Sequence, residues 1–279
     1  MKLNIVPAST GMAWVKLGVR IFWRQPLALA ALFFMTMAAM SLASMVPFVG
    51  PALALALLPS ATLAMMVAAA EATQGRFPTP AVLLVAFRTG RERLNDMLVL
   101  GAMYAVGFLG IMGVSALIDG GQFAQVYLGG MVLTKEIAAE PAFQRAMWVS
   151  MLLYLPLSLL FWHAPGLVHW HRVPPVKAVF FSVVACLRNF GAFLVYGLGW
   201  LGMFMLGGVI VALLSALLTV AGVGGSGAGA IMIAGAMMMA GMFFTSVVFT
   251  FRDCFEPPST LTQGTPHDAA PTPPASGPA

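Results

Sequence analysis

Three histidines within nine residues form the densest group of potentially reactive side chains in this sequence. His163, His169 and His171 lie in the segment FWHAPGLVHWHR. A metal site needs ligands that converge on one point, but residues two apart, such as His169 and His171, project from different faces of a helix. No Cys, Asp or Glu lies nearby in the sequence to complete a coordination sphere. The sequence therefore predicts no metal site here, and rings of this kind are typical of a membrane interface.

His163 is an exception within this group, because it comes deeper in an apolar segment and next to Pro165. An ionisable side chain at membrane depth is a candidate functional residue by default. We therefore take His163 as the candidate intramembrane functional residue, with its partner left open.

Sulfur-containing residues offer a second possible chemistry. The chain has 21 methionines, including Met237–Met239, and 2 cysteines, Cys186 and Cys254. Consecutive methionines point in different directions around a helix and commonly fill apolar space, which argues against a copper site. The two cysteines lack metal-ligand spacing, and we expect them to remain free thiols.

Enzyme signatures are absent from the sequence. It contains no phosphate-binding glycine loop before a Lys, no HExxH motif and no Ser with a plausible His and acidic partner. We expect a protein that is not an enzyme, with no cofactor and no nucleic-acid partner.

The elements that carry these residues are membrane helices. Hydrophobic residues make up 60% of the chain and charged residues 8%, against roughly a quarter charged in soluble domains. No charged residue or histidine occurs in 25–70 or in 189–251. Uncharged apolar stretches longer than about 18 residues are typical of transmembrane helices. The fold class expected is an all-α integral membrane protein.

Six transmembrane helices account for the apolar stretches. The last stretch is too long for one crossing, and the glycine-rich segment 222–229 divides it. Internal prolines make the second and fourth helices the ones expected to be irregular. A single transmembrane domain, 1–255, would precede a disordered Pro-rich cytoplasmic tail, 256–279. The expected spans are 27–46, 51–70, 97–118, 146–168, 190–220 and 230–251.

Basic residues predict the orientation of the chain. Twelve of the 14 Lys and Arg residues fall before the first span, between spans two and three, between spans four and five, or after the sixth. The other side has only Lys135 and Arg145. The positive-inside rule therefore places both termini in the cytoplasm.

The chain also matches itself at two offsets. An offset of 97 residues aligns Pro59 with Pro156 and Arg91 with Arg188, and an offset of 67 aligns Arg24 with Arg91. The matches predict three tandem units, each a basic juxtamembrane helix followed by two spans. The alternative is a coincidental match between apolar segments of low complexity.

The expected juxtamembrane helices are amphipathic. Lys16, Arg20 and Arg24 form one stripe of the first, and the other two begin at Thr79-Pro80 and Pro174-Pro175. We expect these helices to lie in the headgroup layer with the apolar face toward lipid. They either fix the topology alone or form a docking surface for anionic lipid or a protein partner. The candidate basic residues are Lys16, Arg20, Arg24, Arg91, Lys177 and Arg188.

Several segments resemble a bacterial family of uncharacterised multi-pass membrane proteins. They are MKLNIVPAS, GMAWVKLGVRIFWRQPLAL, DGGQFA, LLYLPLSLLFWHAPGLVHWH, CLRNFGAFLVYGL and FFTSVVFTFRDCF. The resemblance covers residues 1 to about 255 and implies residence in the bacterial inner membrane. It supplies no activity and no site residues.

Two functions remain open on the sequence. The favoured one is a non-catalytic membrane protein that binds lipid or protein partners through its basic juxtamembrane helices. The alternative is a transporter or channel component for a small solute, with a pathway past His163. A continuous polar cavity between the helices would favour the alternative, and the lack of acidic residues within the spans favours the first.

Overall fold

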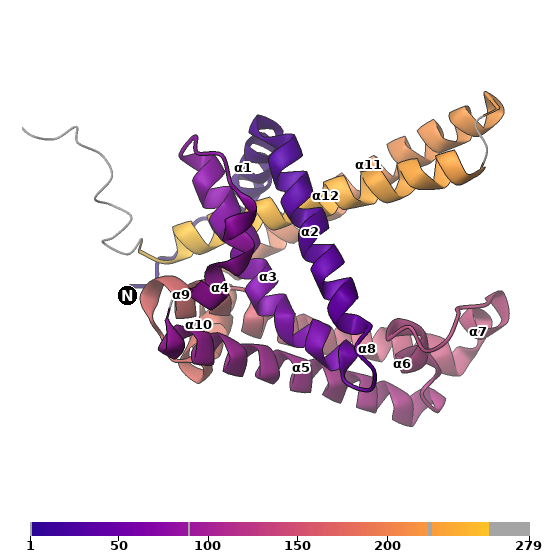
Figure 1. Cartoon of the computed structure of the whole chain (residues 1–279), viewed down its shortest axis with the longest axis horizontal. Coiled ribbons are helices and arrows are strands. Elements are labelled where there is room, and N and C mark those ends of the chain that lie inside the picture. Colours follow the sequence, from indigo (N-terminus) through magenta and orange to yellow (C-terminus); the bar gives the residue numbers. More distant parts are fainter. Residues whose placement is uncertain (1, 89, 223–224, 257–279) are drawn as a thin grey trace, which may run out of the picture.

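The computed structural model describes residues 2–88, 90–222 and 225–256. In this part of the chain, regular structure is helical apart from one isolated β-bridge between Leu3 and Phe255. The helices, shown in Figure 1, are α1 (Thr10–Arg24), α2 (Pro26–Ser44), α3 (Gly50–Thr73), η1 (Pro80–Leu84), α4 (Val85–Arg88), α5 (Arg91–Asp119), α6 (Gln122–Tyr127), α7 (Lys135–Ala139), α8 (Pro141–Phe161), α9 (Ala164–His171), α10 (Pro175–Arg188), α11 (Phe190–Val220) and α12 (Gly225–Cys254). The tail predicted to be disordered lies, from residue 257 on, outside the described residues.

Six helical segments of the described chain are long and apolar enough to cross a membrane. They follow the order of the six spans expected from the sequence, so the all-α membrane fold is confirmed. The long last apolar stretch is divided as expected, because α11 ends at Val220 and α12 begins at Gly225. The six segments are Pro26–Ser44, Gly50–Thr73, Arg91–Asp119, Pro141–His171, Phe190–Val220 and Gly229–Cys254.

The fourth segment is a broken helix. α8 ends at Phe161 and α9 begins at Ala164, with Trp162 and His163 between them. Pro165 has no N–H to donate to a carbonyl one turn earlier, which removes one helical hydrogen bond at this break. In the second span, Pro59 lies inside α3, which continues without interruption. Membrane helices tolerate such a proline when neighbouring groups satisfy the freed carbonyl.

The three expected units occur in order along the fold: α1 with α2–α3, η1–α4 with α5 and α8, and α10 with α11–α12. Each juxtamembrane element packs on the hairpin of another unit. α1 contacts α11 and α12, η1 contacts α3, and α10 contacts α8 and α9. Val15, Val82 and Val179, which the offsets align, are all buried in these contacts. The units are therefore joined in a ring, with the first unit's helix closing on the third hairpin.

Glycines allow α1 to approach its partners closely. A Cβ at Gly11 would collide with the backbone of Ala192, and one at Gly18 would collide with Ser246. Gly101 meets the backbone of Ala56 in the same way. Other glycines in the spans do not have this role, because Gly110, Gly113, Gly197 and Gly202 face open space.

The two ends of the described chain are tied together. Asn4 N–H donates to the Cys254 carbonyl at 2.9 Å, beside the Leu3–Phe255 bridge. Asn189 secures the same segment, since its Oδ1 accepts from Val6 N–H at 2.8 Å and its Nδ2 donates to the Asn4 carbonyl at 3.1 Å. The N-terminal segment is therefore a structural part of the fold.

Candidate functional site

The six predicted basic residues are all exposed. Lys16, Arg20 and Arg24 lie on α1, Arg91 begins α5, and Lys177 and Arg188 lie on α10. None of them forms a salt bridge within the part of the chain that the structure describes. We call these six side chains the basic juxtamembrane surface, and their charges are free to meet a ligand.

The apolar face of α1 packs on protein, which corrects the expectation that it faces lipid. Trp14, Ile21 and Phe22 are almost fully buried, and α1 lies against α11 and α12. The Trp14 indole N–H donates to Asp253 Oδ2 at 2.8 Å, so the helix is fixed by a specific bond as well as by apolar burial. α1 therefore has its basic stripe as its free face.

The packing of α1 leaves a groove beside α11. Met12, Val15, Lys16, Val19 and Arg20 form one wall. The floor and the other wall come from Leu198, Gly199, Gly202, Met203 and Leu206. The groove encloses about 610 Å³, partly because Gly199 and Gly202 have no side chains. We call it the α1–α11 groove. It places the positively charged side chains of Lys16 and Arg20 beside an apolar channel.

α11 contributes an unusually exposed wall to this groove. Only four of its 31 residues are buried, whereas ten of the 24 residues of α3 are. In Figure 1 α12 passes α2, which it contacts, and the outer part of the α11–α12 hairpin extends beyond it. A helix this apolar and this exposed needs lipid or another apolar surface around it.

His163 lies in the break between α8 and α9 and is fully buried. Its backbone N–H donates to Ser182 Oγ at 2.9 Å. Its Nε2 is 3.3 Å from Thr250 Oγ1, and its Nδ1 is 3.8 Å from Cys186 Sγ. The ring therefore joins α9, α10 and α12.

The surrounding bonds assign the tautomer of this histidine. The Thr250 hydroxyl donates to the Val247 carbonyl at 2.7 Å and accepts from the Trp162 indole at 3.0 Å. Nε2 of His163 must then donate to Thr250, and Nδ1 faces the Cys186 thiol. With both nitrogens engaged, the ring is suited to holding α10 and α12 against the break between α8 and α9.

The other side chains with possible chemistry are dispersed. His169 lies against Trp170 and His171 against Phe251 and Phe255. Cys186 and Cys254 are free and buried, and burial raises the pKa of the Cys186 thiol, which keeps it protonated. Met238 is exposed, while Met237 and Met239 pack against the core.

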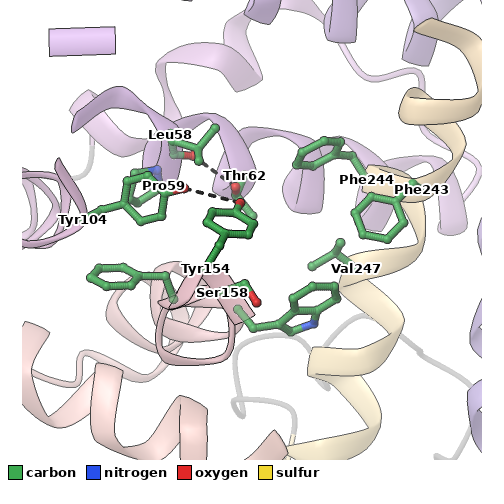
Figure 2. A pocket seen from close by; sticks show the side chains of 11 residues that line it. Leu58, Pro59, Thr62, Tyr104, Tyr154, Ser158, Phe243, Phe244 and Val247 are labelled. Atoms are coloured by element: carbon green, nitrogen blue, oxygen red, sulfur yellow. Dashed lines mark hydrogen bonds between the residues drawn. The ribbon is translucent and has the colours of Figure 1, made fainter. Parts of the chain in front are cut away.

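A central cavity of about 120 Å³ lies among α3, α5, α8 and α12. Figure 2 shows Tyr104, Tyr154, Phe243 and Phe244 around it. The hydroxyls of Tyr104 and Tyr154 are 3.5 Å apart. His163 is not among the residues lining this cavity, although its neighbour Trp162 is. The space is comparable to an apolar cavity of about 150 Å³ that holds one benzene.

Sequence reasoning found the basic side chains but not the groove or the cavity. Lys16 and Gly202 are far apart in the chain and meet only because α1 packs on the third hairpin. The glycines on α11 were the available signal, but periodicity alone does not say which helix lies beside them.

Comparison with known proteins gives the family. The chain is 38% identical over 263 residues to a probable inner membrane protein of Burkholderia thailandensis, covering 91% of this chain and 94% of that one. The chain belongs to the family of this protein. It is accordingly a multi-pass protein of the inner membrane, as its six apolar helices and the sequence resemblance indicated. No family model and no solved structure matches it.

Proposed function

We propose that this family member is a non-catalytic membrane protein that binds anionic phospholipid through its basic juxtamembrane surface. The observation that carries the proposal is the α1–α11 groove, in which Lys16 and Arg20 stand beside an apolar channel. A phospholipid has the same arrangement, with a charged headgroup attached to apolar chains. The groove thus matches both parts of an anionic lipid.

The charges favour anionic over zwitterionic lipid in this groove, because no carboxylate is among its lining residues. A Lys or Arg near an anionic membrane surface contributes about 1 kcal/mol of attraction. Lys16 and Arg20 together then favour an anionic headgroup by about 2 kcal/mol. Arg24, Arg91, Lys177 and Arg188 extend the positive potential along the same membrane surface.

This proposal places both termini and the basic juxtamembrane surface in the cytoplasm, where anionic headgroups attract basic segments. Single cysteines in a Cys-free background test it, with Ser9→Cys and Thr79→Cys on the cytoplasmic side and Val132→Cys on the other. Only Val132→Cys should react with an impermeant thiol reagent in intact cells. Labelling of Ser9→Cys from outside would reverse the orientation. The native cysteines are unsuitable reporters because both are buried.

A transporter or channel component for a small solute is the alternative. It calls for a polar pathway, whereas the central cavity is small and lined mainly by aromatic side chains. A second cavity of about 190 Å³ on the other side of Tyr154 is lined mostly by apolar residues. These linings support the lipid-binding proposal over transport.

The groove is tested by native mass spectrometry of the purified protein with phosphatidylglycerol. Lys16→Gln/Arg20→Gln should lower retention of this lipid by roughly tenfold or more. Lys177→Gln/Arg188→Gln, with the same loss of charge outside the groove, should have a much smaller effect. Equal losses in the two double variants would show that only net charge matters.

The apolar channel is tested separately. Gly202→Leu should fill it, since nothing lies near a Cβ at this position. Gly208→Leu is the matched control, because Gly208 also faces open space on α11 but does not line the groove. We expect phosphatidylglycerol retention to fall in Gly202→Leu alone. Unchanged retention would contradict a lipid chain in the groove.

A further inference from the structure

A second hollow, of about 310 Å³, lies where the last turns of α3 and α12 meet α9. Its inner wall is apolar and includes Val67, Val248 and Phe249. Its rim is charged, with Glu71 and Arg76 from the α3 end and Arg252 from α12. We call it the α3–α12 pocket. Its size falls in the usual range of small-molecule sites, about 300–1,000 Å³.

The charges on this rim are not neutralised by one another. Within the described part of the chain, the side chains of Glu71 and Arg76 have no hydrogen bond or salt bridge. Glu71 is nevertheless half-buried. Arg252 bonds Asp253 at 2.8 Å and lies over the Phe249 ring at 5.1 Å, which holds its guanidinium at the pocket. A half-buried carboxylate near two guanidinium groups is thus left available for a ligand.

Several groups around the pocket favour a cationic group on that ligand. α3 and α12 both end here, at Thr73 and Cys254, and helix C-termini favour positive charge. Glu71 adds a full negative charge, and the indole of Trp170, which lines the pocket, can accept a cation on its face. A purely anionic ligand would be attracted by Arg76 and Arg252 but opposed by Glu71 and the two helix C-termini.

We propose that the α3–α12 pocket binds a zwitterionic phospholipid headgroup with a primary ammonium, as in phosphatidylethanolamine. Arg76 and Arg252 contact the phosphodiester, and Glu71 accepts hydrogen bonds from the ammonium. The apolar wall of Val67, Val248 and Phe249 receives the adjoining glycerol and upper acyl chains. The site is distinct from the α1–α11 groove and takes a different lipid.

Native mass spectrometry tests this with phosphatidylethanolamine, phosphatidylcholine and phosphatidylglycerol of identical acyl chains. The wild-type protein should retain phosphatidylethanolamine better than phosphatidylcholine, whose quaternary ammonium cannot donate to Glu71. Glu71→Gln should lower phosphatidylethanolamine retention by roughly fivefold, the effect of about one charge contact. The control Glu140→Gln, an exposed carboxylate outside the pocket, should change nothing.

Arg76→Gln is the second variant, and it keeps the test informative if Glu71→Gln is poorly folded. It should also lower phosphatidylethanolamine retention, while Lys16→Gln/Arg20→Gln should leave that lipid in place. Unchanged phosphatidylethanolamine retention in both Glu71→Gln and Arg76→Gln would overturn the site without affecting the groove proposal.

Two further measurements separate the lipid from other occupants. Millimolar phosphoethanolamine should not displace the lipid, because it lacks the apolar part that the inner wall receives. Displacement would indicate a soluble ligand and overturn the assignment. Deletion of residues 257–279 should leave phosphatidylethanolamine retention unchanged, and a gain would show that the tail is the native occupant.

Discussion

The α1–α11 groove and the α3–α12 pocket are built from similar parts but differ in the charges of their side chains. Both join charged side chains to an apolar wall formed by membrane helices. The groove has Lys16 and Arg20 with no carboxylate, whereas the pocket sets Glu71 beside Arg76 and Arg252 at two helix C-termini. In the two proposals, a single carboxylate distinguishes the site for zwitterionic lipid from the site for anionic lipid.

The largest effect should come from separating α1 from its partners. Gly11→Leu/Gly18→Leu introduces side chains where even a Cβ collides with Ala192 and Ser246. Overpacking of this kind costs about 1–3 kcal/mol at each site. We expect a clear fall in thermal stability and loss of phosphatidylglycerol retention. Retention of phosphatidylethanolamine in the α3–α12 pocket should fall less.

The matched control is Gly197→Leu/Gly208→Leu, in which both glycines lie on α11 and face open space. Thermal unfolding in detergent compares the two double variants. Equal melting temperatures would mean that α1 is not held by these close contacts.

Exchanging the charge patterns of the two sites should exchange their lipid preference. Glu71→Lys leaves the α3–α12 pocket with only basic side chains on its rim, and Arg20→Glu gives the groove one charge of each sign. Each reversal changes headgroup attraction by about 2 kcal/mol, or more than tenfold in the ratio of the two lipids. Competition between phosphatidylethanolamine and phosphatidylglycerol on each variant measures this ratio. An unchanged ratio of the two lipids in both variants would show that charge does not set the difference between the two sites.

His163→Phe should destabilise the bundle without altering either lipid preference. The substitution removes the bonds to Thr250 and Cys186 from a fully buried position. Each lost hydrogen bond costs about 0.5–1.5 kcal/mol, and the larger phenyl ring must also fit a fully packed position. Thermal unfolding and lipid retention are measured together. Normal stability with altered solute uptake in liposomes would instead support the transport alternative.

The smallest effect is expected from removing residues 257–279. This segment is rich in Pro, Ser and Thr and has little apolar surface to bury. Its deletion should leave membrane insertion, thermal stability and phosphatidylglycerol retention unchanged. A large loss of stability would indicate a docking site for the tail.

Local properties of the chain were enough to predict six membrane helices. The segment 25–70 has no charged residue, and Pro47 and Gly50 divide it into α2 and α3. Val15, Val82 and Val179, which align at the two offsets of the predicted repeat, are all buried. Hydropathy and turn residues act over a few neighbours, which is why sequence reasoning succeeded here.

Tertiary structure alone decided what each helix packs against. The stripe of Lys16, Arg20 and Arg24 marked the free face of α1, but nothing in its periodicity indicated that α12 and not lipid would cover the other face. Glu71 and Arg252 looked like ordinary boundary residues until the ends of α3 and α12 were brought together. A helical pattern determines which side chains share a face. Only the packing of distant helices determines which faces meet, and therefore where a site can form.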